Sequence, residues 1–182
     1  MNYISLSFLL FVTLVFVFYF LTPLKWRWVV LLIASYAFYL LADAKYLIFV
    51  VITTASTFYA ALLIERINRK AKEVLGKNED VWDADKRKSF SRAQLRKSRA
   101  VLTLALLLIF GILGFLKYYN FVAANIGALF GLPENAWQLE ILLPIGISFY
   151  TFQTASYLID IYRGAYKADR NIAKYALFVA FF

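Results

Sequence analysis

Cysteine and histidine are both absent from the 182 residues of the chain. Without cysteine, these residues hold no disulfide, no thiolate nucleophile and no cysteine-ligated metal. Without histidine, they lack the commonest general base and the commonest metal ligand. We therefore expect no metal site here, and any enzymatic function must use other chemistry or residues outside this chain.

Long polar stretches are also scarce, because apolar residues make up 63% of the chain. Soluble domains contain roughly 45–50% apolar residues, and the mean hydropathy of +0.67 is correspondingly high. Several runs approach the ~20 residues that a helix needs to cross the hydrocarbon core. The composition predicts an all-α, polytopic integral membrane protein.

The apolar runs predict about five spans plus interfacial helices. As one helix, residues 28–64 would be about 55 Å long, far beyond the ~30 Å core, so we expect a turn at 42–45. Thr22-Pro23 ends the first run, because proline cannot continue a helix. The predicted spans are 3–21, 28–41, 46–64, 101–119 and 141–162, with a further one beginning at Lys174.

Three other segments are expected to shape the bundle. Residues 65–100 predict an amphipathic helix in the membrane interface, followed by a charged loop. Residues 121–130 are too few to span, which favours an interfacial or re-entrant helix ended by Gly131-Leu132-Pro133. Gly111 and Gly114 are three residues apart, a spacing that lets a neighbouring backbone approach closely.

The net charge of +9 is unevenly distributed, since twelve of the 20 basic residues lie between 65 and 100. Beside membrane spans, such a segment is more typical of a cytoplasmic loop facing anionic lipid than of nucleic-acid binding. With the N-terminus outside, 18 of the 20 basic residues fall on the inner side, leaving Lys45 and Lys117 outside. The positive-inside rule favours this orientation.

The last residues, 175–182, are eight apolar residues after Lys174 with no polar cap. A helix that stopped inside the bilayer would leave carbonyls and a carboxylate in hydrocarbon. We expect that residues 1–182 are the N-terminal portion of one longer membrane domain. The alternative is that 175–182 lies along the interface as a true end.

One predicted span, 141–162, carries many hydrogen-bonding groups, and helical spacing gathers them on one face. That polar face comprises Gly146, Tyr150, Gln153, Tyr157, Asp160 and Gly164. A neighbouring face is small, and it comprises Ser148, Thr151 and Ala155. The opposite face is apolar, and it comprises Ile145, Phe149, Phe152 and Ile159.

Unpaired polar groups are costly against lipid, so the polar face must contact protein or a wet cavity. It either joins helices through hydrogen bonds or lines a substrate passage. Arg163 can pair with Asp160 at i,i+3 spacing. Pro144 suits the first turn of this helix, and Gly146 permits close packing.

The string LLPIGISFYTFQTASYLIDIYRG at 142–164 resembles the hallmark segment of the membrane-bound O-acyltransferase (MBOAT) family, in its AlgI/DltB-like bacterial branch. Two further stretches support the resemblance, LLIASYAFYLLADAKYLIFVVITTASTFY at 31–59 and GFLKYYNF at 114–121. It implies a multi-span α-helical enzyme with a central channel, in a bacterial cytoplasmic membrane. It also implies acyl transfer from a cytoplasmic donor toward hydroxyls of a cell-surface polysaccharide or teichoic acid.

The resemblance implies no bound cofactor, an acetyl-CoA or acyl-carrier-protein donor, and often an extracytoplasmic acyltransferase partner. The family's essential histidine follows the hallmark segment, so no catalytic residue can be assigned here. Substrate-channel candidates are Tyr150, Gln153, Tyr157 and Asp160. Candidate structural residues are Pro144, Gly146, Ser148, Arg163 and Gly164. The alternatives are a transporter or channel subunit, and a non-catalytic membrane scaffold.

Overall fold

The computed structural model describes residues 6–42, 44–131, 137, 139 and 146–181, of which 86% are helical and none is in a strand. The all-α prediction is therefore confirmed. In chain order the elements are α1 (Leu6–Leu21), the 3-10 helix η1 (Leu24–Trp26), α2 (Arg27–Ala42), α3 (Ala44–Lys77), α4 (Ala84–Leu129), α5 (Ile147–Arg163) and α6 (Ile172–Ala180).

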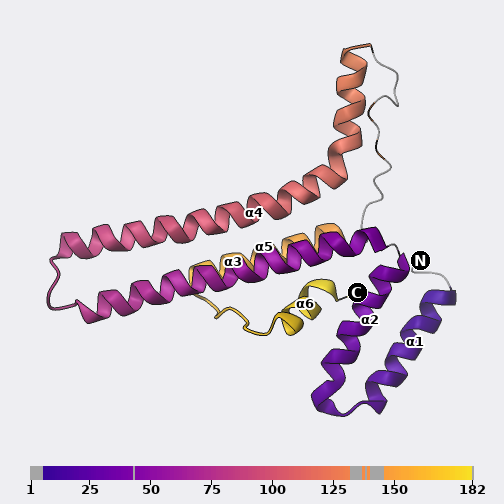
Figure 1. Ribbon diagram of the computed structural model, residues 1–182, viewed down its shortest axis with the longest axis horizontal. Coiled ribbons are helices and arrows are strands. Elements are labelled where there is room, and N and C mark those ends of the chain that lie inside the picture. The colour runs from indigo at the N-terminus through magenta and orange to yellow at the C-terminus, as the bar shows by residue number, and fades with distance from the viewer. Residues whose placement is uncertain (1–5, 43, 132–136, 138, 140–145, 182) are drawn as a thin grey trace.

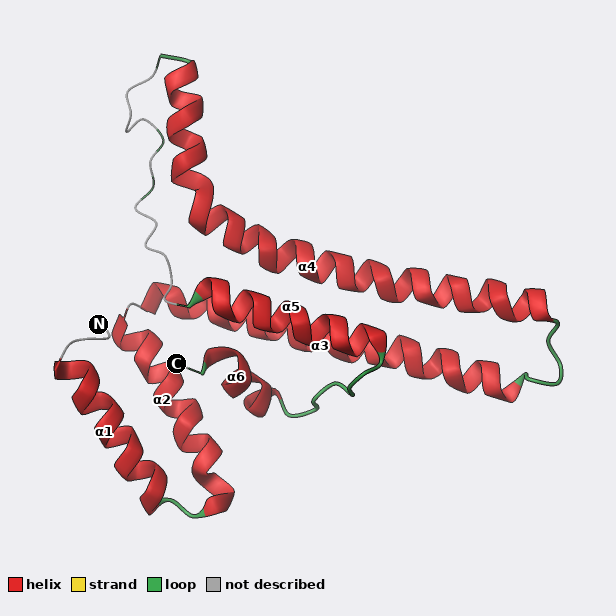
Figure 2. Ribbon diagram, turned by 180° about the vertical axis from the view of Figure 1, so that it is seen from behind, coloured by secondary structure: helices red, strands yellow, loops and turns green. Residues whose placement is uncertain are grey.

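The helices form two antiparallel hairpins of very different length (Figure 1). The short hairpin is α1 and α2; the long one is α3 and α4, whose tip projects beyond all the other helices. α5 lies along α3, and α6 lies against α2 and α3, as the view from behind also shows (Figure 2). α5 thus contacts both helices of the long hairpin.

Three stretches of the described chain are long and apolar enough to cross a membrane: Leu24–Leu41, Leu47–Lys77 and Ala84–Leu129. The helix Leu6–Leu21 is apolar but shorter. The chain is thus a membrane protein with an all-α fold. α5, with 17 residues and a polar face, is not one of these three stretches. The expected count of about five spans therefore stays a prediction.

The helix predicted at the start of 65–100 is confirmed, because α3 continues to Lys77. The charged loop predicted after it is wrong, because only residues 78–83 separate α3 from α4, which begins at Ala84. The amide nitrogens of Val81 and Trp82 donate to the Asn78 carbonyl at 3.3 and 3.1 Å, which closes the tip of the hairpin. Lys, Arg, Glu and Ala are strong helix formers, so these charged sequences continue the helices beyond their apolar parts.

The predicted separate helix at 121–130 is also wrong, because these residues continue α4 as far as Leu129. No proline or glycine lies between the predicted span and this segment to interrupt the helix. α4 instead bends in its C-terminal part (Figure 1). The helix ends before Gly131, whose φ of +67° is left-handed; Leu132 and Pro133 lie outside the described residues.

Gly111 and Gly114 do not mark a close helix contact. A Cβ atom built on either one would have nothing within 4 Å among the described residues. Without a β-carbon, glycine instead eases bending of a long helix. The close approach predicted from their spacing is therefore wrong for this part of the chain.

Both predicted helix breaks near the N-terminus are confirmed. α1 ends just before Thr22-Pro23, and α2 ends at Ala42, two residues before α3 begins. Arg27 secures the first break by donating from Nε to the Thr22 carbonyl at 3.2 Å. Its guanidinium also lies 5.0 Å from the centre of the Tyr19 ring, a cation–π distance.

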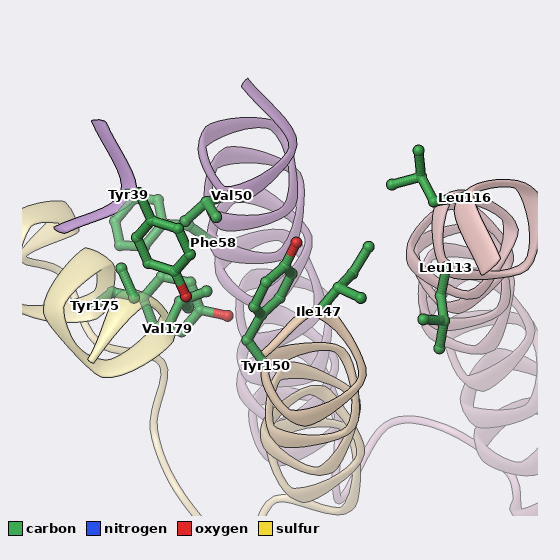
Figure 3. Close-up of a cluster of buried hydrophobic side chains, with 10 residues drawn as sticks. Tyr39, Val50, Phe58, Leu113, Leu116, Ile147, Tyr150, Tyr175 and Val179 are labelled. Atoms are coloured by element: carbon green, nitrogen blue, oxygen red, sulfur yellow. The ribbon is translucent and has the colours of Figure 1, made fainter. Parts of the chain in front are cut away.

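Two clusters of buried apolar side chains hold α5 in place. The first joins α2, α3, α4, α5 and α6, and it includes Tyr39, Val50, Phe58, Ile147, Tyr150 and Tyr175 (Figure 3). The second lies at the other end of α5, and it includes Ala61, Ile64, Leu102, Leu158 and Ile161. The buried side of α5 is thus packed against the long hairpin along its whole length.

Candidate functional site

α5 is bounded by a glycine at each end. Gly146 at its start and Gly164 after its end have φ of +78° and +75°, a left-handed backbone conformation that residues with a Cβ atom rarely adopt. The amide of Gly164 donates to the Ile161 carbonyl and that of Ala165 to the Asp160 carbonyl, both at 3.0 Å. This is a Schellman termination, so Gly164 ends the helix and turns the chain toward α6.

The predicted orientation of α5 is confirmed. Tyr150 is only 2% exposed, and Gln153 and Tyr157 are half-buried. On the opposite face, Phe149 and Phe152 are 70% and 61% exposed. The polar face therefore points into the bundle and the aromatic face points out, as the cost of unpaired polar groups in lipid requires.

Gln153 and Tyr157 are hydrogen-bonded to the segment that follows α5. Gln153 donates from Nε2 to the carbonyl of Phe178 in α6 at 3.0 Å. The hydroxyl of Tyr157 accepts from the Asp169 amide at 2.9 Å, and its ring lies 4.9 Å from that of Tyr175. Both residues thus join α5 to α6 and to the connection between them.

Tyr150 is packed differently from these two. Its ring lies among the side chains of the first cluster (Figure 3), and its hydroxyl has no hydrogen-bond partner among the described residues. A Cβ atom at Gly146 would lie 3.8 Å from the Tyr39 hydroxyl, so this glycine is in ordinary contact distance of α2. Tyr150 therefore contributes apolar packing and leaves one buried polar atom unused.

Asp160 lies half-buried near the C-terminal end of α5, while Arg163 is exposed. The described residues contain no ion pair between them, so the predicted pair is wrong. Exposed pairs contribute only about 0–1 kcal/mol, so little stability is lost when Arg163 does not pair with Asp160. No group of three or more acidic, histidine or cysteine side chains that could hold a metal occurs among the described residues.

The small face of α5 is buried as well. Thr151 and Thr154 are at most 1% exposed, and the hydroxyl of Thr154 donates to the Tyr150 carbonyl at 2.9 Å. Ser148 is half-buried, and Pro144 lies outside the described residues. The small side chains let α5 pack closely, and Thr154 satisfies its hydroxyl within its own helix.

A second row of polar residues, on α3, was not predicted from the sequence. Thr53 and Thr57 are at most 1% exposed, and Thr57 donates to the Thr53 carbonyl at 2.6 Å. The buried hydroxyl of Tyr175 donates to the Thr57 hydroxyl at 2.8 Å. Threonines four residues apart inside an apolar run were the available signal, because that spacing puts both on one helical face.

Glu65 and Asn68 were also missed, although Glu65 is the first charged residue after the apolar part of α3. Glu65 accepts from the Ala168 amide at 3.2 Å and lies 3.9 Å from the guanidinium of Arg170. Asn68 donates to the Tyr162 carbonyl at 3.3 Å. These contacts fix the end of α5 and the following connection against α3.

Comparison with known proteins identifies relatives of this chain. A probable alginate O-acetylase AlgI from Azotobacter vinelandii is 34% identical over 167 residues, which are 90% of this chain and 28% of the relative. Proteins of the same name from Pseudomonas syringae pv. tomato and Pseudomonas aeruginosa are 33% and 31% identical, over 90% of this chain and 27% of their own length. The chain belongs to the membrane-bound O-acyltransferase family.

This family assignment confirms the resemblance seen in the 142–164 string. The chain spans only about 27–28% of the length of these relatives. No family model and no solved structure matches it. The roles of individual side chains in the family's chemistry therefore remain predictions.

Proposed function

We propose that the chain is part of an integral-membrane O-acyltransferase that transfers an acyl group, most simply acetyl, toward hydroxyls of a cell-surface polysaccharide. The observation that carries this proposal is the 31–34% identity, over 90% of the chain, to proteins named probable alginate O-acetylase. The long apolar helices support it, because such a transferase acts across a membrane.

Within that enzyme, α5 has two roles. Gln153 and Tyr157 hold α6 against the bundle through the hydrogen bonds described above. Tyr150 and Asp160 keep polar side-chain atoms that make no hydrogen bond or ion pair with described residues. We assign these two residues to the wall of the substrate channel, which buried or half-buried polar groups in a membrane helix commonly line.

Acyl transfer to a hydroxyl needs a base, because an alcohol is a poor nucleophile until its proton is removed. None of the 182 residues is a histidine, and a tyrosine phenol with a usual pKa near 10 is a weak candidate for a base near neutrality. We therefore place the catalytic base outside this chain and expect these residues alone to be inactive. The donor would be acetyl-CoA or an acyl carrier protein, and an extracytoplasmic acyltransferase would complete the transfer.

The distribution of charge supports a bacterial cytoplasmic membrane with the N-terminus outside. In that orientation, 18 of the 20 basic residues lie on the inner side. The tip of the α3–α4 hairpin then projects into the cytoplasm, on the side where the acyl donor is made. Accessibility labelling of single cysteines introduced at Asn78 and at Lys45 would test this orientation from the two sides.

The decisive experiment is complementation in a bacterium whose own alginate O-acetylase gene is deleted. The complete gene that encodes this chain should restore ester-linked acetate on the exported polysaccharide, whereas residues 1–182 alone should not. Membrane insertion of both proteins is checked by immunoblotting. A complete, inserted protein that yields no acetyl ester contradicts the proposal, and solute uptake by that protein in liposomes would favour a transporter.

A further inference from the structure

A groove of about 390 Å³ lies between α3 and α4, in the half of the hairpin that is nearer its tip. Its basic lining comes from both helices and comprises Arg66, Lys70 and Lys97. Leu63 and Ile67 form an apolar wall at one end, and Phe90 lies at the end toward the tip. No acidic residue lines it. Its volume is within the range of about 300–1,000 Å³ that is typical of ligand pockets.

The three basic side chains of the groove are available to a ligand. All three are exposed, and none has an acidic partner within 4.0 Å in the described part of the chain. Three carboxylates of the hairpin pair with basic residues outside the groove: Glu65 with Arg170 at 3.9 Å, Glu73 with Arg69 at 3.8 Å and Glu79 with Arg87 at 3.4 Å. The groove therefore concentrates positive charge that the protein itself does not neutralise.

The position of the groove along the hairpin matches the level of lipid headgroups. The apolar part of α3 ends at Ile64, and that of α4 begins at Val101. The groove starts at Leu63, on this boundary, and Lys70 lies about 10 Å beyond it at 1.5 Å per residue. The headgroup layer is about 5–8 Å thick on each side of the hydrocarbon. Arg66 and Lys97 thus lie within that layer, and the backbone of Lys70 lies just beyond it, within the reach of a long lysine side chain.

We propose that this groove binds the headgroup of an anionic phospholipid of the inner leaflet. The phosphodiester contacts Arg66, Lys70 and Lys97, and the start of an acyl chain lies against Leu63 and Ile67. Three cations converging on one anionic group are the complementary charge that argues for this occupant. The inference depends on the membrane placement of α3 and α4, and it is independent of the acyl-transfer proposal.

The test uses the complete protein purified in detergent with equal amounts of phosphatidylglycerol and phosphatidylethanolamine of the same chain length. Native mass spectrometry then counts the lipids that stay bound. The groove variant Arg66→Gln/Lys70→Gln/Lys97→Gln is compared with Lys72→Gln/Lys77→Gln/Arg96→Gln, which removes the same charges from the same helices outside the groove. All six positions are exposed, so both variants should fold.

The unsubstituted protein should retain phosphatidylglycerol in preference to phosphatidylethanolamine. In the groove variant this preference should fall by about tenfold or more, because each basic residue near a membrane surface contributes substantially to anionic-lipid binding. In the control variant the preference should change by less than about twofold. Equal losses in the two variants would show a diffuse field and overturn the site. Unchanged lipid retention with weakened acetyl-CoA binding would assign the groove to the donor and overturn the lipid proposal.

Discussion

α3 contains two regions in which polar side chains are satisfied in opposite ways, by protein partners in one and by exposure in the other. In its apolar half, Thr57 is fully buried and its hydroxyl both donates to Thr53 and accepts from Tyr175. Beyond Ile64, Arg66 and Lys70 are exposed and have no acidic partner among the described residues. The helix is continuous through both regions, so the surroundings, and not the backbone, decide how polar groups are satisfied.

The difference follows from the solvent on each side of the boundary. In hydrocarbon an unpaired polar group has no water to bond with and costs several kcal/mol, so the protein must provide a partner. In water the same group is already hydrated, and pairing it contributes little. We therefore expect substitutions in the buried half of α3 to change stability. Substitutions in its exposed half, toward the tip of the hairpin, should change ligand binding.

The largest effect is expected at Gly164, which turns the chain from α5 toward α6 with φ of +75°. Gly164→Ala should lower the free energy of unfolding by about 1–2 kcal/mol, because an L-residue is strained in the left-handed region. Gly76→Ala is the control, since this helical glycine has open space around it and alanine favours helix by about 1 kcal/mol. Unfolding in mixed micelles should show changes of opposite sign, and changes of equal sign would contradict the assignment.

The next effect separates the two faces of α5. Gln153→Leu removes the hydrogen bond to the Phe178 carbonyl, and a side-chain hydrogen bond within a membrane bundle contributes about 0.6–1.7 kcal/mol. Phe152→Leu changes a side chain that is 61% exposed. Acetyl-ester formation by the complete enzyme should fall further in the Gln153 variant. Equal activities at equal membrane levels would mean that the α5–α6 contact has no part in the reaction.

A finer comparison uses two buried tyrosines of the same cluster. Tyr175→Phe removes the hydroxyl that donates to Thr57 at 2.8 Å, and it should cost about 0.5–1.5 kcal/mol of stability. Tyr150→Phe removes a hydroxyl without a partner among the described residues, so stability should stay constant or rise. Thermal unfolding in detergent measures both, and a larger loss from Tyr150→Phe would show that its hydroxyl is bonded in the complete enzyme.

The inward orientation of α5 was predictable because helical periodicity alone separates Tyr150, Gln153 and Tyr157 from Phe149 and Phe152. The breaks at Thr22-Pro23 and near Ala42 followed from proline chemistry and from bilayer thickness. These predictions depend on local sequence and on one external length. They needed no knowledge of which helices are neighbours.

The errors arose where hydropathy was used to predict secondary structure. The later charged residues of 65–100 were assigned to a loop, yet Lys86, Arg92 and Lys97 lie in α4 because their helix propensity does not depend on burial. The contacts of Gln153 with Phe178 and of Glu65 with Ala168 join residues 25 and 103 positions apart. No local pattern specifies such partners, so only the packed structure reveals them.

The smallest effect is expected at the exposed pair of Arg69 and Glu73, whose side chains are 55% and 62% exposed. Glu73→Gln should change the free energy of unfolding by less than about 0.5 kcal/mol, since i,i+4 pairs in water contribute about 0.3–0.5 kcal/mol. Glu65→Gln is the matched substitution on the same helix, at a side chain that is only 19% exposed and bonded to the Ala168 amide. Because glutamine keeps one acceptor oxygen, only part of that contact is lost, yet the cost should still exceed that at Glu73. Urea unfolding of the complete protein in micelles at low and high salt distinguishes the two substitutions. A larger cost at Glu73 would mean that the charged half of the hairpin is not the solvated region that its charges indicate.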